Sequence, residues 1–195
     1  DWFTDMLFTI QGIDDVIPAV FNYSRFVCDV ERLENDPMEK EGQGIIYDYY
    51  GGYVRRLNPE MRERIFKLRE DRLSRIVENI SDNGSTVLID CHSFTQADED
   101  APDICVGFNG DFSYDERIVD LLLKEFNSSG YSTALNKPYA NTLTPVKDKE
   151  YKSVMIEVNK RIYLDAGTLL LNPNPRQWMR WYGCLGRIYR GILVM

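Results

Sequence analysis

The sequence contains a single histidine, His92, and only four cysteines, which are widely separated and form no CxxC pair. No apolar run approaches the roughly 20 residues that a bilayer-spanning helix needs. The first residues have neither the basic start nor the apolar core of a signal peptide. Together these absences predict a cytoplasmic protein with reduced thiols.

Basic residues are outnumbered by acidic residues, 23 to 31, which gives a formal charge of -8 and a pI near 4.8. An acidic chain repels nucleic acid and anionic membrane surfaces, so we expect neither as the main partner. Hydrophobic residues make up 44% of the 195 residues, which is enough for a sizeable core. We therefore expect residues 1–195 to form a single domain. The chain does not begin with methionine, and its first residues already belong to a helical pattern. We therefore also expect that an amino-terminal piece is missing.

Short apolar runs alternate with helical patterns, without internal repeats, and this alternation predicts one α/β domain of three layers. Helical spacing predicts helices over residues 1–12, from 59 to the Asn83-Gly84 breaker, over 114–127 and over 177–193. Short apolar runs predict strands at 19–21, 26–28, 86–89, 104–107, 133–135 and 154–158. Asn58 and Ser113 are the expected caps of the second and third helices. The glycine-rich stretch 33–52 is typical of a lid or specificity loop.

The apolar run 86–89 ends in a polar cluster that contains His92. In open α/β sheets, ligand-binding and catalytic groups gather at such strand ends. A neutral imidazole is a good zinc ligand, and Asp90, two residues away, could orient its second ring nitrogen. Spacing alone supports an alternative equally well, in which a half-buried histidine only closes a turn.

Two further predicted strand ends carry polar side chains. Arg25 and Arg32 flank the strand at 26–28, and Glu157 is the lone charge in the run 154–158, where a carboxylate costs several kcal/mol unless it is paired or used. Metal-assisted amide hydrolysis needs a zinc ion with one open coordination position. It also needs a carboxylate that takes the proton from the bound water and delivers it to the leaving amine. An arginine can hold a developing oxyanion or a substrate carboxylate.

In this combination the sequence resembles the N-formylglutamate amidohydrolases, members of the zinc-carboxypeptidase-like superfamily. The resemblance extends from Asp1 to about Asp165, and its motifs occur in consistent order at 24–32, 90–94, 103–110, 136–139 and 155–163. It implies a three-layer α/β/α fold with a mixed central sheet, from which this chain lacks an amino-terminal strand. It also implies a Zn²⁺ cofactor and a small-molecule substrate. The implied reaction, a step of histidine degradation, hydrolyses N-formyl-L-glutamate to formate and L-glutamate.

The resemblance also implies roles for individual residues. His92 corresponds to the second zinc histidine of the family, and Asp1 to its acidic zinc ligand, with Asp5 as the alternative. Glu157 corresponds to the catalytic carboxylate that activates the metal-bound water. The residues implied in substrate binding are Arg25, Arg32, Asn136 and Tyr139.

Two departures from the family pattern leave alternatives open. The first zinc histidine of the family has no counterpart, since His92 is the only histidine, and a catalytic zinc usually has three protein ligands. Glu31 replaces the usual asparagine, and its carboxylate could pair with Arg32 and weaken the attraction for an acidic substrate. The alternatives are therefore a metallo-hydrolase of another N-acyl amino acid or a peptide, and a metal-free binding domain. The sequence leaves the oligomeric state open.

Overall fold

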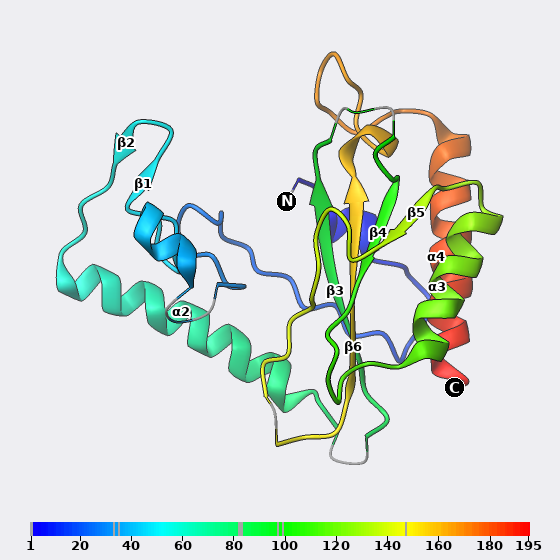
Figure 1. The fold of residues 1–195 in the computed structure, drawn as a ribbon, viewed down its shortest axis with the longest axis horizontal. Helices are drawn as coiled ribbons and strands as arrows, with labels where there is room; N and C mark the ends of the chain where they lie inside the picture. The colour runs from blue at the N-terminus through cyan, green and yellow to red at the C-terminus, as the bar shows by residue number, and fades with distance from the viewer. Residues whose placement is uncertain are drawn as a thin grey trace. The chain divides into compact units, whose positions relative to one another are not determined.

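The computed structural model describes residues 2–32, 34, 36–81, 84–96, 98, 100–146 and 148–195. The chain forms two compact units (Figure 1). The first unit comprises Asp1–Pro18 and Ser81–Met195, and the second comprises Ala19–Ile80. That the whole chain acts as one domain stays a prediction.

The first unit is built on a four-stranded sheet in the order β3-β6-β4-β5. Its strands are β3 (Val87–Phe94), β4 (Ile104–Gly107), β5 (Thr133–Leu135) and β6 (Lys152–Asn159). β3 and β6 are parallel, whereas β4 is antiparallel to β6 and parallel to β5. The predicted α/β class with a mixed central sheet is therefore confirmed, and the four apolar runs predicted beyond residue 80 all lie in this sheet.

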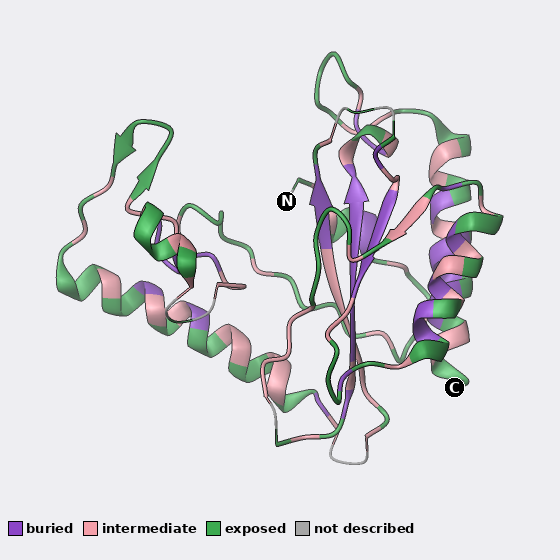
Figure 2. Cartoon of the chain, in the orientation of Figure 1, coloured by how far each residue is buried: buried purple, intermediate pink, exposed green. Residues whose placement is uncertain are grey.

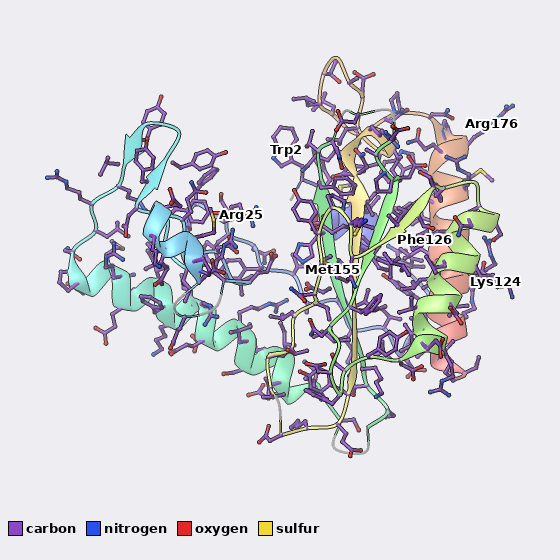
Figure 3. The ribbon with its side chains drawn as sticks, in the orientation of Figure 1. Trp2, Arg25, Lys124, Phe126, Met155 and Arg176 are labelled. Atoms are coloured by element: carbon purple, nitrogen blue, oxygen red, sulfur yellow. The ribbon has the colours of Figure 1, made fainter. Side chains whose placement is uncertain are left out.

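Successive side chains of a strand point to opposite sides of the sheet. One face, the apolar face, packs on the main core, and the other, here called the polar face, carries Asp90, His92 and Glu157. On the apolar face, Val154, Ile156 and Val158 of β6 are buried in the main core. The intervening Met155 and Glu157 point to the opposite face, and Figure 3 labels Met155 on this strand. In Figure 2 the central strands are mostly buried, so both faces of the sheet are largely covered.

Helices α1 (Thr4–Phe8), α3 (Glu116–Ser128) and α4 (Pro175–Leu193) pack on the apolar face. α3 and α4 lie side by side (Figure 1), and their inward sides are buried (Figure 2). Phe126 of α3 stacks on Trp181 of α4 with ring centroids 5.9 Å apart, and Figure 3 labels Phe126 on the inner side of its helix. Among the described residues, no helix is long and apolar enough to cross a membrane.

The helix starts differ in part from the prediction. α4 begins after its cap Asn174, close to the expected start. The predicted cap Ser113 of α3 is wrong: the cap is Asp115, whose carboxylate accepts the backbone N–H of Arg117 at 2.9 Å. A carboxylate at this position also interacts favourably with the helix dipole. Ser113 is fully buried and donates to Oδ1 of Asp111 at 2.7 Å instead.

The second unit has a small core of Cys28, Ile45, Ile46 and Ile65. Its elements are the short helix η1 (Pro37–Glu41), the hairpin strands β1 (Tyr49–Tyr50) and β2 (Tyr53–Val54), and the long helix α2 (Pro59–Glu78). The predicted cap of α2 is confirmed, since Asn58 accepts the N–H of Met61 at 2.8 Å. The predicted strands at 19–21 and 26–28 are wrong. Val27 donates its N–H to the Ser24 carbonyl at 2.7 Å and thereby closes a turn.

Candidate functional site

His92 and Glu157 occupy adjacent paired positions of the parallel strands β3 and β6. Each is the sixth residue of an eight-residue strand, so both lie near a carboxyl end. Neighbouring strands are about 4.8 Å apart, and paired residues point to the same face. Both residues are buried: 7% of the surface of His92 and 8% of that of Glu157 is exposed to solvent. An imidazole and a carboxylate therefore share one water-poor position at the sheet end where ligands commonly bind.

Asp90 orients the ring of His92, as its spacing predicts. Oδ1 of Asp90 lies 2.8 Å from Nε2 of His92, and Oδ2 accepts the backbone N–H of Leu143 at 2.9 Å. Burial alone raises the pKa of the Asp90 carboxyl, but His92 and the Leu143 N–H outweigh burial and lower the pKa below its usual value. Nε2 of the ring thus faces Asp90, and the carboxylate fixes the orientation of the imidazole.

Asn136 and Tyr139 lie on the segment that crosses the polar face of the sheet. Asn136 adopts a left-handed conformation with φ 51°, and its Oδ1 accepts the N–H of Phe108 at 3.0 Å. Tyr139 is half exposed, and its carbonyl accepts a hydrogen bond from the thiol of Cys105 at 3.1 Å. Cys105 is in turn paired with Glu157 between β4 and β6. Their contribution to a substrate pocket stays a prediction.

Asn159 and Arg161 hold the loop between β3 and β4, a role that the sequence pattern does not reveal. Asn159 donates to the Gln96 carbonyl at 3.1 Å. Arg161, in the short helix η2 (Lys160–Ile162), pairs with Asp103 at 3.0 Å and donates to the Ala101 carbonyl at 2.5 Å. A pocket of about 370 Å³ opens at this loop. Its described lining consists of Gln96, Asp98, Asp100, Ala101, Pro102, Lys137 and Pro138.

In the second unit, Arg25 and Arg32 share one buried carboxylate. Asp29, of which 2% is exposed, accepts from Arg25 at 3.1 Å and lies 3.6 Å from Nε of Arg32. The Tyr47 hydroxyl donates to the same carboxylate at 3.3 Å, and Asp36 lies 3.5 Å from Arg32. Burial lowers the pKa of the Arg25 guanidinium, but Asp29 outweighs burial and the pKa is raised. The structure thus brings the two predicted substrate arginines together.

The described residues offer a nitrogen ligand for zinc but not a complete site. No group of three or more His, Cys, Asp or Glu side chains in the described part of the chain is arranged to hold a metal ion. Asp1, the predicted acidic ligand, lies outside the described residues, and the alternative Asp5 is exposed on α1. His92 therefore suits one ligand position, while the described residues alone fall short of the three that a catalytic zinc usually has.

The sequence matches the family described as N-formylglutamate amidohydrolase over residues 1–164. An N-formylglutamate amidohydrolase from Ralstonia eutropha JMP134 is similar in structure, with a TM-score of 0.61, 19% sequence identity, and coverage of 87% of this chain and 72% of that chain. A gene product from Agrobacterium tumefaciens has a TM-score of 0.56 and 17% identity, with coverage of 87% and 69%. No match was found among curated proteins.

Proposed function

Because this chain belongs to the N-formylglutamate amidohydrolase family, we propose that it hydrolyses an N-acyl amino acid, with N-formyl-L-glutamate as the first substrate to test. The products would be formate and L-glutamate. The observation that carries the proposal is the adjacency of His92 and Glu157, two buried groups capable of proton transfer, at the carboxyl ends of parallel strands.

Glu157 is the proposed general base. Its carboxylate takes a proton from the attacking water, whose oxygen bonds to the carbonyl carbon of the substrate. The carbon–nitrogen bond then breaks, and the same carboxylate passes the proton to the leaving amine. Because Glu157 is a buried residue of the inner strand β6, the strand positions its carboxylate. Asp90 keeps the adjacent imidazole of His92 in one orientation.

Zinc is the proposed cofactor, with His92 and Asp1 as two of its ligands. When bound, zinc polarises an amide carbonyl and makes water more acidic. The Asp90–His92 pair supports this proposal, since metal-binding histidines commonly direct their second nitrogen to a carboxylate. Elemental analysis of the purified protein tests it. Stoichiometric zinc would support the proposal, whereas a preparation that neither holds nor takes up zinc would favour a metal-free binding domain.

Arg25 and Arg32 are proposed to bind the carboxylate of the substrate. Their side chains remain 44% and 29% exposed, although Asp29 holds both of them. A guanidinium that is fixed before the substrate arrives loses less entropy on binding. Asn136 and Tyr139 are proposed to line the pocket of the same substrate. Arg25→Ala is therefore expected to raise KM more than it lowers kcat.

A second candidate substrate is an N-acyl amino acid with an uncharged side chain. The charges of Arg25 and Arg32 are balanced within their own cluster, and Glu31 places a further negative charge near Arg25. A second substrate carboxylate would therefore gain little attraction there. Next to Arg25, the half-exposed ring of Phe26 packs against Tyr50 with centroids 4.9 Å apart, which would suit an apolar side chain.

Formate release from N-formylated amino acids tests both candidates. N-formyl-L-glutamate, N-formyl-L-glutamine and N-formyl-L-phenylalanine differ in the side chain alone, so their kcat/KM values rank the two substrate classes. Glu157→Gln should lower kcat by about 10²- to 10⁴-fold. The matched control Glu116→Gln changes an exposed residue of α3 and should leave kcat unchanged. Full activity of Glu157→Gln would overturn the assignment of the base.

A further inference from the structure

Residues 139–143 cross the polar face of the sheet and are held there by side chains of the sheet and its loops. We call these residues the crossing segment; in Figure 1 they follow β5, where the chain turns back across the strands. The side chains that hold the backbone of the crossing segment are those of Asp90, Cys105, Asn109 and Ser153. Two of them, Cys105 and Asn109, lie in the motif at 103–110.

Asn109 binds the backbone of Thr142 through both ends of its side-chain amide. Its Oδ1 accepts the N–H of Thr142 at 3.2 Å, and its Nδ2 donates to the carbonyl of the same residue at 3.1 Å. Two hydrogen bonds to one residue fix its direction as well as its position. Because Asn109 follows the end of β4 by two residues, this clamp ties the crossing segment to the sheet.

Gly107, the last residue of β4, allows the crossing segment to approach the sheet this closely. A Cβ atom at residue 107 would lie 2.7 Å from the carbonyl oxygen of Asn141, closer than such atoms come to a backbone. Glycine is the residue that permits close contact of one backbone with another. The backbone contact at Asn141 and the clamp at Thr142 therefore hold two consecutive residues of the crossing segment.

Ser153 of β6 connects this clamp to Leu143 and thereby to the candidate site. The Ser153 residue is almost fully buried, and its hydroxyl donates to the Leu143 carbonyl at 2.8 Å. A serine hydroxyl has one hydrogen, so Thr142 is the donor of the 2.8 Å bond between its Oγ1 and Oγ of Ser153. The Leu143 N–H donates to Oδ2 of Asp90 at 2.9 Å, and Oδ1 of Asp90 lies 2.8 Å from Nε2 of His92. Both backbone groups of Leu143 are thus held.

We propose that Asn109 and Ser153 are positioning residues for the imidazole of His92. They fix the Leu143 N–H, which holds one oxygen of Asp90 and so keeps the other oxygen directed at the ring. A carboxylate that is bonded at both oxygens cannot turn, and a fully paired network of this kind is rigid. All of these groups belong to the first unit. The consequence for turnover rests on the proposed function, in which the reaction takes place beside His92.

Asn109→Ala removes both hydrogen bonds to Thr142. The matched control is Asn127→Ala, because Asn127 is an exposed residue of α3, on the apolar face, whose side chain accepts from Thr133 at 3.1 Å. In Asn109→Ala we expect the Leu143 amide to exchange hydrogen at least about tenfold faster than in the unmodified protein. In the control this rate should stay the same.

The ring of His92 provides a measurement that a purely structural clamp would not change. Because His92 is the only histidine, its ring signals are unambiguous in NMR spectra of the protein without a histidine tag. An ionised Asp90 can only accept, so Nε2 carries a proton that faces the carboxylate. We expect this proton to exchange with water at least about tenfold faster in Asn109→Ala than in Asn127→Ala.

Turnover of the best N-formyl substrate is the third measurement. A displaced imidazole should lower the kcat of Asn109→Ala by about 10- to 100-fold, because small displacements in an active site cost up to about that much. Equal Leu143 exchange, ring-proton exchange and kcat in Asn109→Ala and Asn127→Ala would overturn the proposal. Faster Leu143 exchange with an unchanged ring proton and unchanged kcat would leave Asn109 a structural role and overturn it as well.

Ser153→Ala tests the same inference from β6 and decides it if Asn109→Ala does not fold. Its matched control is Ser128→Ala, because Ser128 also donates to a backbone carbonyl, that of Glu125 at 3.1 Å, but lies exposed on α3. Ser153→Ala should accelerate both exchange rates and lower kcat, whereas Ser128→Ala should change none of the three. Identical behaviour of the two serine variants would contradict the proposal.

Failure of the proposed function has a different signature. An unmodified protein that releases formate from no N-formyl amino acid contradicts the proposed function itself. The two exchange rates then still decide whether Asn109 and Ser153 position His92, since neither rate requires turnover. Faster exchange of both protons in Asn109→Ala with unchanged kcat would support the positioning of the ring and exclude His92 from the rate-limiting step.

Discussion

Asp90 and His92 lie on the same face of β3, with Oδ1 of the carboxylate 2.8 Å from Nε2 of the imidazole. Residues two apart on a strand share a face, so the pair forms within one element and moves as a unit. The second carboxylate oxygen is held by the Leu143 N–H. The orientation of His92 is therefore determined by β3 together with the segment that covers its polar face.

Asp90→Asn tests this orientation. The amide keeps the size of the carboxylate but loses its charge and one acceptor, so it holds the imidazole less firmly. We expect kcat/KM for the best N-formyl substrate to fall by about 10- to 100-fold. Asp120→Asn, an exposed change on α3, is the control. Identical kinetics in the two variants would contradict a role for Asp90 in orienting His92.

The lowered pKa of Asp90 also predicts how stability depends on pH. Its folded-state pKa lies below the unfolded value of about 3.9, so the carboxylate stabilises the fold above that pH. This contribution is lost as the pH falls through the folded-state pKa. We therefore expect Asp90→Asn to lower the free energy of unfolding, measured with urea, by more at pH 6 than at pH 3. A difference that grows on acidification would refute the sign of the shift.

The four cysteines should be unreactive in the folded protein. Burial raises the pKa of the Cys28 thiol to about 11, and burial with the nearby Asp90 raises that of Cys91 to about 12. Burial also raises the pKa of the Cys105 and Cys184 thiols. The thiolate is the reactive form, so a disulfide reagent at pH 8 should modify the thiols of the native chain slowly. After unfolding, the same reagent should modify four thiols per chain. A rapidly labelled native thiol would argue against this prediction.

Arg161→Ala should release the loop between β3 and β4. The substitution removes hydrogen bonds to Asp103 and to the Ala101 carbonyl, and bonds of charged groups contribute about 1.5–3 kcal/mol each. Because the guanidinium is partly exposed, we expect the free energy of unfolding to fall by about 1–3 kcal/mol in total. Arg176→Ala, at the exposed start of α4 (Figure 3), is the control for loss of a surface arginine. Equal stability of both variants would show that Arg161 does not anchor the loop.

Strands β3, β4 and β6 were predictable because each packs apolar side chains against the core, whereas β5 has no buried residue. β3, however, extends beyond the apolar run 86–89 to Phe94, because the polar residues Asp90, His92 and Ser93 interrupt the apolar pattern within the strand. The predicted strand at 26–28 failed for a different reason. Arg25 and Asp29 form an ion pair across a turn there, which apolar content alone does not reveal.

The candidate site was predictable only where its contacts are local. The spacing of Asp90 and His92 on one strand was sufficient to predict their interaction. By contrast, the hydrogen bond from Tyr163 to the Trp2 carbonyl joins residues 161 positions apart. Contacts of this kind depend on how the helices pack on the sheet, so no local sequence pattern predicts them.

The position of Glu157 between Ile156 and Val158 also has a consequence for folding. Both neighbours are fully buried on the apolar face, while Glu157 lies on the other. A slip of β6 by one residue against β3 would exchange the two faces, placing the carboxylate among the helices and an isoleucine beside His92. Burying a carboxylate among apolar side chains costs several kcal/mol. The residue proposed for catalysis therefore also disfavours misaligned strand pairing, and a substitution such as Glu157→Leu should permit misfolding as well as abolish turnover.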